Sequence, residues 1–349
     1  MTFRRSILAL FVTVVATATF PFLAGCGSTP TIVQPPVGPA YAVAFNPTTN
    51  LVYTGDISGN VSVLNGTTNT VLSTIRVGGT PYGIAVNPKT NTIFVANFIS
   101  NSVSTIDGST QTLTATVPLY SGSNNPLEIT LNAVTNKVYV LQSPDSGPGV
   151  LSVIDGSTHQ ITAEQVMAGA SSVAVNTTTN EVYVANAQEL EIINGTTGVV
   201  STTITYPTPF TTPTLAPALP VIAVNETTDT IYVSGGIGTD TVYVISGQQG
   251  QIAATLSVPQ LGGSIAVDPA ANLVYLASGN ATGYGVSIIN GSTNTLAGAI
   301  AFAVSAVNAG GDTAASLAVN AAAHLLYVAE SSVGFQAVAT PQSTTSIVN

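Results

Sequence analysis

Charged residues are scarce in this chain. Lys, Arg, Asp and Glu make up 6% of its 349 residues, and it has one cysteine, two histidines and no tryptophan. A single cysteine excludes a framework of internal disulfides, and two histidines leave few ligands for zinc. Aliphatic residues that alternate with Thr, Ser and Asn are plentiful instead. This composition is typical of a β-rich globular protein and not of a disordered one.

Basic residues are the rarest charged class. Removing Arg4 and Arg5 with the N-terminal segment leaves three of the five Lys and Arg residues against 15 Asp and Glu, a net charge of −12. Nucleic acids are bound mainly by Lys and Arg that neutralise phosphates. The sequence therefore predicts no nucleic-acid partner.

A repeating unit organises the chain, and Pro81–Leu119 is a clear copy of it. This segment holds four short runs of β-forming residues separated by turn sequences, which predicts a four-stranded antiparallel meander. The unit recurs every roughly 40–50 residues, a period typical of propellers and solenoids. An Asn or Asp, which we call the first anchor, ends the first strand of each unit. An Asn, Asp or His, the second anchor, comes four positions later, and an aromatic residue comes seven positions after the first anchor. The first anchors are Asn46, Asn87, Asn132, Asn176, Asn225, Asp268 and Asn320. The second anchors are Asn50, Asn91, Asn136, Asn180, Asp229, Asn272 and His324. The aromatic residues are Tyr53, Phe94, Tyr139, Tyr183, Tyr232, Tyr275 and Tyr327.

Turn chemistry explains the anchors. In Asn87–Asn91, the side chain of the first Asn can accept a hydrogen bond from the backbone amide two residues later, and Pro88 favours the φ of a type I turn. The second anchor needs a left-handed backbone, which Asn, Asp, His and Gly tolerate best. The turn between the third and fourth strands has a constant length and carries Gly in second place. Its copies are Asn65–Asn69, Asp107–Gln111, Asp155–His159, Asn194–Gly198, Ser246–Gly250 and Asn290–Asn294.

The first strand of each unit carries small side chains on one face and large side chains on the other, and both faces are apolar. Such a strand packs between two neighbouring sheets, as it does near the axis of a propeller. We therefore predict an all-β fold, a seven-bladed β-propeller of four-stranded antiparallel blades over residues 40–349. The expected blades are 40–80, 81–124, 125–169, 170–217, 218–263, 264–312 and 313–349. The last blade has its own candidate fourth strand, Thr344–Val348, although a strand exchange that uses Thr31–Val33 is an alternative.

The segments Ile93–Asn97 and Val182–Asn186, with endings such as Val153–Gly156, resemble the YVTN-type (YncE-like) β-propeller repeats. The resemblance extends from residue 40 to about residue 340 and implies the seven-bladed fold. Members of that family are mostly secreted, periplasmic or surface proteins. One branch is associated with DNA, and more distant relatives include lactonases and redox-enzyme subunits. The family thus implies a fold and not one activity.

Residues 1–25 have the pattern of a signal peptide. Arg4 and Arg5 precede an apolar run that ends in Leu23-Ala24-Gly25-Cys26, which resembles a bacterial lipobox. We therefore expect cleavage before Cys26 and lipid on its sulfur; an uncleaved anchor or an ordinary signal peptide is the alternative. Residues 26–39 are rich in proline and predict an extended tether. The protein is then an exported lipoprotein, facing the periplasm or the cell surface.

No residue set has the pattern of a catalytic site. His159 and His324 fall on turn positions that other units fill with Asn, Gln, Gly or Asp, so a structural role explains both. Arg76, Lys89 and Lys137 lie on an outer strand or at turns, and none is placed to hold a substrate carboxylate. Lactonase chemistry would need acid, base and cationic groups at the axis. We predict no catalytic residue, no metal and no cofactor.

Glu128 is the unusual residue of the first strands, because its equivalents are small or apolar. Those equivalents are Ala42, Gly83, Ser172, Val221, Ser264 and Ser316. A carboxylate here could face the channel mouth and help to bind a cation. The interpretation we favour is a solvated strand start.

The connections of the meander alternate between two faces. The first and third turns share one face, and their length hardly varies; we call this the constant face. The second and unit-to-unit connections share the other, and their length varies widely, as in Gln142–Val150 and Tyr206–Leu219; we call this the variable face. Variable loops on a rigid ring are common binding sites. The aromatic residues there either contact a partner or cap the core. The candidate partner-binding residues are Phe98, Tyr120, Glu128, Asp145, Tyr206, Phe210 and Tyr284.

Three classes of function remain from the sequence. A lipid-anchored, non-catalytic binding or scaffold propeller fits all of its features, with a protein or glycan of the cell envelope as partner. A hydrolase or lyase of the lactonase type fits the fold but lacks the residues. A purely structural surface protein fits the composition.

Overall fold

The structure is a computed structural model. It describes residues 39–119, 124–144, 149–210, 219–236, 239–259, 261–280, 283–301, 314–330 and 334–340. Cys26, Tyr120 and Asp145 lie outside the described residues, as do Thr31–Val33 and Thr344–Val348. Residue 284 belongs to a described strand, but the side chain of Tyr284 lies outside the described part.

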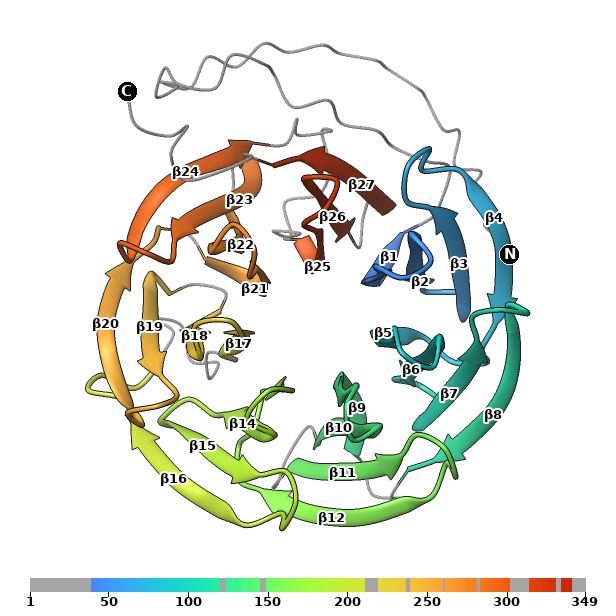
Figure 1. Cartoon of the computed structure of the whole chain (residues 1–349), viewed down its shortest axis with the longest axis horizontal. Coiled ribbons are helices and arrows are strands. Elements are labelled where there is room, and N and C mark those ends of the chain that lie inside the picture. Colours follow the sequence, from blue (N-terminus) through green and yellow to red (C-terminus); the bar gives the residue numbers. More distant parts are fainter. Residues whose placement is uncertain are drawn as a thin grey trace, which may run out of the picture.

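The chain forms a ring of seven antiparallel sheets, which confirms the predicted seven-bladed propeller (Figure 1). Within each blade the strands follow one another in chain order, and the first strand is nearest the axis. The described residues supply four strands to each of six blades and three strands to the seventh.

Blades 1 and 2 consist of β1 (Ala40–Asn46), β2 (Leu51–Asp56), β3 (Asn60–Asn65), β4 (Val71–Arg76), β5 (Pro81–Asn87), β6 (Thr92–Asn97), β7 (Ser102–Asp107) and β8 (Thr112–Pro118). Blades 3 and 4 consist of β9 (Asn124–Asn132), β10 (Lys137–Pro144), β11 (Gly149–Asp155), β12 (Ile161–Met167), β13 (Ser172–Asn176), β14 (Glu181–Ala185), β15 (Glu189–Asn194) and β16 (Val200–Thr205). Blades 5 and 6 consist of β17 (Val221–Asn225), β18 (Thr230–Ser234), β19 (Thr241–Ser246), β20 (Gln251–Ser257), β21 (Leu261–Asp268), β22 (Leu273–Asn280), β23 (Gly283–Asn290) and β24 (Thr295–Ala301). Blade 7 consists of β25 (Ala314–Asn320), β26 (Leu325–Glu330) and β27 (Gly334–Ala339).

The turns have the backbone that the sequence predicts. All seven second anchors lie in the left-handed region, with φ between 52° and 57°, and His324 is one of them. The last residue of the third turn is left-handed in six blades, and His159 occupies that position with a φ of 59°. Both histidines are therefore explained by turn geometry.

The core lies between neighbouring blades, so each blade buries both faces of its inner strands. The aromatic residue of every second strand is buried, from Tyr53 in β2 to Tyr327 in β26. Fourth strands are mostly exposed, as in β4, where Ile75 is the one buried residue. This gradient from an apolar interior to a polar outer strand is what the repeat predicts.

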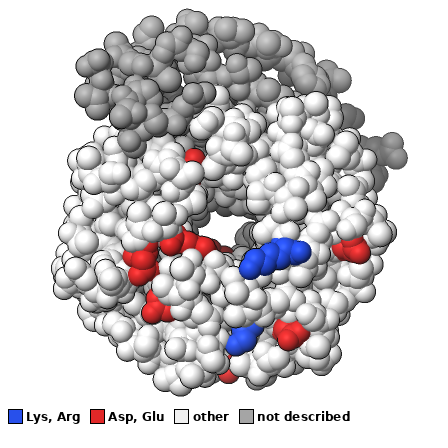
Figure 2. Space-filling model, viewed as in Figure 1, with Lys and Arg blue, Asp and Glu red and all other residues white. Residues whose placement is uncertain are grey.

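The ring is open at its centre, and few charged residues mark the face seen in Figure 2. No helix in the described part of the chain has the length and apolar character needed to cross a membrane.

Candidate functional site

The constant face is held together by its own anchors. The amide of a first anchor donates to the side-chain oxygen of the second anchor in the next blade, at 2.7 to 2.9 Å. The pairs are Asn46–Asn91, Asn87–Asn136, Asn132–Asn180, Asn176–Asp229 and Asn225–Asn272. The oxygen of the same first anchor accepts from its own turn, as Asn87 does from the amide of Lys89 at 3.0 Å. The hydrogen-bonding groups of these side chains are therefore used within the fold.

The glycine of the third turn is required by the same arrangement. Its amide donates to the carbonyl of the second anchor, as Gly108 does to Asn91 at 2.8 Å. A Cβ atom at Gly108 would lie 2.4 Å from the side-chain oxygen of Asn91, and the equivalent approaches in the other five blades are 2.3 to 2.6 Å. These glycines were visible in the sequence. The turn requires them because of a close contact with another turn, which can be seen only in the folded structure.

Candidate metal ligands do not gather in the described residues, where no group of three or more His, Cys, Asp and Glu side chains could hold an ion. The Lys137 ammonium donates to the carbonyl of Gly195 in the next blade at 2.7 Å, so this cation also ties blades together.

Glu128 lies on β9 and bridges to the first strand of the next blade. Its carboxylate accepts from the amide of Val173 at 2.8 Å. Two equivalent serines do the same: Ser172 accepts from Ile222 at 3.1 Å, and Ser316 accepts from Val43 at 3.3 Å. In these three blades, the side chain at this position therefore links two neighbouring first strands. Our expectation of a solvated strand start was wrong, because Glu128 is half-buried and engaged by β13.

Burial also changes the acidity of this group. Desolvation raises the pKa of Glu128 to about 7, although hydrogen bonds from Ser172 and Val173 act in the opposite direction. The carboxyl is therefore close to half-protonated near neutral pH.

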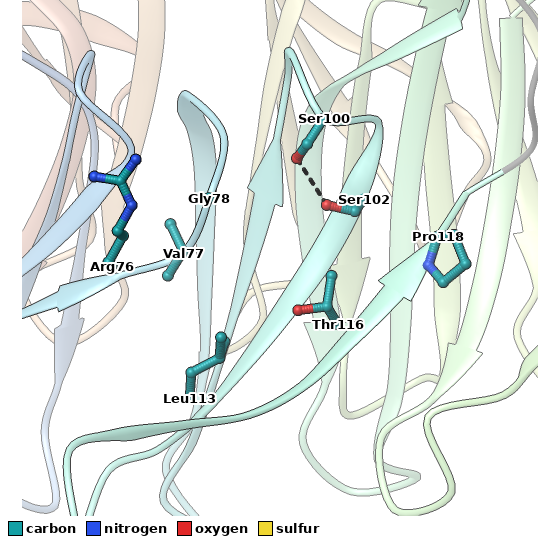
Figure 3. Close-up of a pocket in the computed structure, with 8 residues that line it drawn as sticks. All are labelled: Arg76, Val77, Gly78, Ser100, Ser102, Leu113, Thr116 and Pro118. Atoms are coloured by element: carbon teal, nitrogen blue, oxygen red, sulfur yellow. Dashed lines mark hydrogen bonds between the residues drawn. The ribbon is translucent and has the colours of Figure 1, made fainter.

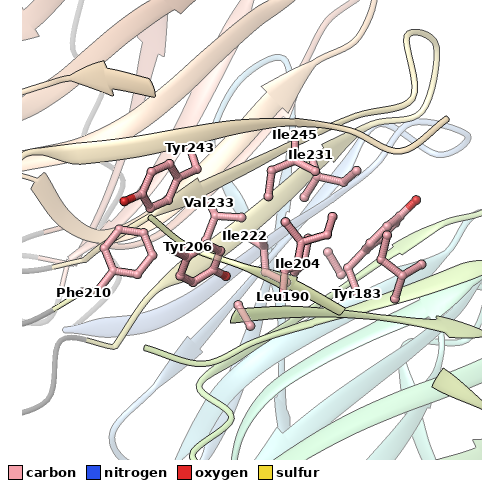
Figure 4. Close-up of a cluster of buried hydrophobic side chains, with 13 residues drawn as sticks. Tyr183, Leu190, Ile204, Tyr206, Phe210, Ile222, Ile231, Val233, Tyr243 and Ile245 are labelled. Carbon is pink, nitrogen blue, oxygen red and sulfur yellow. The ribbon is translucent and has the colours of Figure 1, made fainter. Parts of the chain in front are cut away.

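Tyr206 and Phe210 belong to the core. Their exposed fractions are 2% and 3%, and both rings contact Tyr243, with centroids 5.1 and 5.3 Å away (Figure 4). The Tyr243 hydroxyl donates to the carbonyl of Thr208 at 2.8 Å, which fixes the start of the connection. Of the two roles that the sequence left open, these rings have the second: they cap the core between blades 4 and 5.

Phe98 is part of a row of three aromatic rings. Tyr41 and Tyr82 stack with centroids 4.9 Å apart and an interplanar angle of 14°, and Tyr82 stacks on Phe98 at 4.6 Å and 26°. All three residues are half-buried. Burial, and then the neighbouring Tyr41, raise the pKa of Tyr82. We call Tyr41, Tyr82 and Phe98 the aromatic row.

Two members of the aromatic row come from equivalent positions, near the start of β1 and β5. The equivalent residues of the other blades are Leu127, Ser171, Pro220, Gly263 and Ala315. Sequence reasoning missed Tyr41 and Tyr82 because they looked like ordinary residues of first strands. Their absence from the other five units was the signal that could have identified them.

A shallow groove of about 560 Å³ opens between blades 1 and 2 (Figure 3). The exposed Arg76 lies at one side, and the hydroxyls of Ser100 and Ser102, 2.8 Å apart, lie at the other. Val77, Leu113, Thr116 and Pro118 complete the lining together with Gly78. No described residue forms an ion pair or hydrogen bond with the Arg76 guanidinium. Within the described part of the chain, the groove therefore presents an unpaired cation together with apolar and hydroxyl groups.

The aromatic row and the groove meet at one loop, Asn97–Asn101. Phe98 extends from this loop, its amide donates to the carbonyl of Thr80 at 2.8 Å, and Ser100 lines the groove. This loop belongs to the variable face. Among the predicted candidates in the described part of the chain, the structure brings Phe98 into a cluster and leaves Glu128 in the neighbouring blade.

Comparisons of the chain with protein-family models and with curated proteins find no match.

Proposed function

We propose that this protein is a lipid-anchored, non-catalytic binding or scaffold module of the bacterial cell envelope, related to the YVTN-type propellers. Its partner is a protein or glycan of the envelope. The observation that carries the proposal is the half-buried aromatic row, whose Phe98 belongs to the same loop as Ser100 of the groove. Partly exposed aromatic rings on a rigid scaffold are common anchors of binding.

The non-catalytic part of the proposal rests on how the reactive groups are used. Glu128 is held by the backbone of Val173, and His159 and His324 are held in turns. A general acid or base needs access to its substrate within hydrogen-bond reach. Glu128, Ser172 and Ser316 of the first strands join neighbouring blades instead.

The test is a comparison of what co-purifies with the native lipidated protein. Tyr82→Ala/Phe98→Ala removes two rings of the aromatic row, and Thr48→Ala/Thr90→Ala changes the constant face as a matched control. Both proteins are first compared by thermal unfolding. Quantitative mass spectrometry and glycan analysis then follow each component that wild type retains.

We expect the first variant to lose partners at least about tenfold, since removal of a central aromatic contact costs about 2 kcal/mol or more. The control should retain them. Equal retention by both folded variants, or loss in the control alone, would reject this face as the binding surface.

A further inference from the structure

The groove between blades 1 and 2 is lined by one of the few basic residues of the chain. Of the three basic residues in residues 39–349, Lys137 donates to the carbonyl of Gly195, and Lys89 lies in a turn of the constant face. Arg76 is the third; it ends β4, is exposed and lines the groove. Its guanidinium has no ion-pair or hydrogen-bond partner among the described residues, so it can bind an anion from outside the chain.

The part of the chain around this groove is electrically neutral, unlike the rest of the protein. Residues 39–119, which form blades 1 and 2, contain two acidic residues, Asp56 and Asp107, and two basic residues, Arg76 and Lys89. Residues 120–349 contain the other 13 acidic residues and one basic residue, a net charge of −12. Salt screens charges that are more than about 8 Å apart at physiological ionic strength, so the local charge matters most to a ligand. An anion in the groove therefore meets no net negative charge from blades 1 and 2.

The two carboxylates of blades 1 and 2 are used elsewhere. Asp56 accepts from the amides of Ser58 and Asn60 at 2.8 and 3.0 Å, and from the Asn60 side chain at 3.0 Å. Asp107 lies in a third turn on the constant face, where it accepts from two amides of that turn. The Arg76 guanidinium therefore keeps its N–H donors for a ligand, and their fork matches the two oxygens of a carboxylate.

The other side of the groove supplies hydroxyl groups that are held by a buried network. The side-chain amide of Asn97 donates to the hydroxyls of Ser102 and Ser104 at 3.3 and 2.8 Å. Ser104 in turn donates to the carbonyl of Val77 at 3.1 Å. Ser102 and Ser100 share a hydrogen bond of 2.8 Å, which uses one of their two hydroxyl protons (Figure 3). Within the described part of the chain the second proton has no acceptor, so it can be donated to a ligand in the groove.

We propose that this groove binds an acidic sugar chain, with the carboxylate of a uronic acid on Arg76 and sugar hydroxyls on Ser100 and Ser102. The inference rests on the proposed function and names the class of its partner. The groove volume of about 560 Å³ lies within the range of roughly 300–1,000 Å³ that is usual for ligand sites. The ring of Phe98, on the same loop as Ser100, offers an apolar contact to a sugar ring that extends beyond the groove.

The hydroxyl groups of the lining favour a sugar over an acidic peptide. Ser100, Ser102 and Thr116 each carry a group that both donates and accepts, as the hydroxyls of a sugar do. An acidic peptide could place a carboxylate on Arg76, but it lacks the closely spaced hydroxyls that these three side chains match. A neutral sugar would match the hydroxyls and leave the guanidinium without a partner. A sugar that carries a carboxylate satisfies both sides of the groove.

Calorimetric titration of the full-length protein with three probes tests the proposal. The probes are an oligomer of galacturonic acid, the same oligomer with its carboxylates converted to methyl esters, and an oligoglutamate peptide of equal charge. We expect the acidic sugar to bind and the ester and the peptide to bind at least about tenfold more weakly, because each loses one of the two sets of contacts. Binding of the acidic sugar should also weaken as salt is added.

Two variants of the groove and one matched control complete the test. Arg76→Gln should weaken binding of the acidic sugar at least about tenfold, since a hydrogen-bonded charge is lost. Ser100→Ala removes a hydroxyl and should weaken it about threefold. Lys89→Gln removes the same charge from the constant face and should bind as wild type does. Arg76 and Lys89 are both exposed, so neither change disturbs the core.

The proposal is overturned if the acidic sugar does not bind, if the ester or the peptide binds equally well, or if Arg76→Gln and Lys89→Gln weaken binding equally. Its failure can be distinguished from failure of the proposed function by the co-purification experiment. If Tyr82→Ala/Phe98→Ala loses native partners and Arg76→Gln retains them all, the aromatic row is a binding surface but the groove is not a carboxylate site.

Discussion

At the scale of single residues, Glu128 shows how one substitution in a repeat changes the physics of a junction. Ser172 and Ser316 make the same contact to the next blade with a neutral hydroxyl. Glu128 makes it with a group that carries charge when deprotonated, in a place where protein atoms have displaced water. The junction between blades 3 and 4 therefore depends on pH in a way that a serine junction does not.

The pKa of Glu128 gives a prediction with a definite sign. Its folded value of about 7 lies above its ordinary value of 4.5, so the folded state binds more protons than the unfolded state between these limits. The free energy of unfolding should therefore fall as pH rises from 4.5 to 7, by on the order of 2 kcal/mol from this group. Urea unfolding at several pH values measures it.

Glu128→Gln is the comparison for that measurement. Its amide oxygen can still accept from Val173, and the group no longer titrates, so this part of the pH dependence should vanish. Glu164→Gln removes an exposed carboxylate of the same blade and should keep the wild-type profile. An unchanged slope in Glu128→Gln would show that another group is responsible.

At the scale of elements, the paired turns of the constant face act as one unit. The second anchor accepts a hydrogen bond from the amide of the glycine and presents its side chain to the preceding blade. Asn91, for example, accepts from Asn46 at 2.8 Å and donates to Ser109 at 3.2 Å. A change in one turn should therefore be felt in two blades.

Gly108→Ala tests this coupling. The new Cβ atom would meet Asn91 at 2.4 Å, so the turn or the anchor must shift, and we expect a loss of about 2 kcal/mol or more of unfolding free energy. Gly298→Ala is the control, since nothing lies within 4 Å of its added Cβ atom. That variant should be neutral or more stable by about 0.5 kcal/mol. Denaturant unfolding distinguishes the two, and equal costs would contradict the contact.

Much of the fold could be predicted from the sequence because the anchors are local. Asn91 needs its left-handed backbone whatever surrounds it, and seven copies of one pattern specify seven blades. The candidate site was harder to predict than the fold, because its contacts join residues of different blades. Spacing could not show that Tyr206 and Phe210 turn inward onto Tyr243, or that Tyr41 stacks on Tyr82.

At the scale of the whole molecule, the blades are alike on one face and different on the other. Five anchor pairs run in one direction around the ring, and through them each of blades 1 to 5 donates to the next blade. On the variable face the connections differ in length from blade to blade, and in the described part of the chain the aromatic row lies in blades 1 and 2. A partner that binds there would meet one sector of the ring and not its axis of pseudosymmetry.

Export of the molecule gives another prediction. We expect the mature chain to begin at Cys26 with lipid on its sulfur, because the lipobox-like Leu23–Cys26 follows an apolar run. Mass spectrometry of the mature N-terminal peptide is the measurement. Cys26→Ala should release the protein from the membrane fraction or block its processing. A chain that begins at another residue, or a free Cys26 thiol, would contradict the prediction.

The third turns also bear on how the protein ages. Three of them contain the pair Asn-Gly, at Asn65, Asn194 and Asn290. Spontaneous deamidation of such pairs requires the glycine nitrogen to attack the asparagine side chain. In the folded ring that nitrogen donates to a neighbouring turn, as Gly66 does to Asn50 at 2.8 Å, and Asn65 holds the amides of Thr67 and Thr68. Asn-Gly pairs that would deamidate quickly in a free peptide are thus protected by the hydrogen bonds of the folded turns. Deamidation at these pairs would record the time that each molecule has spent unfolded.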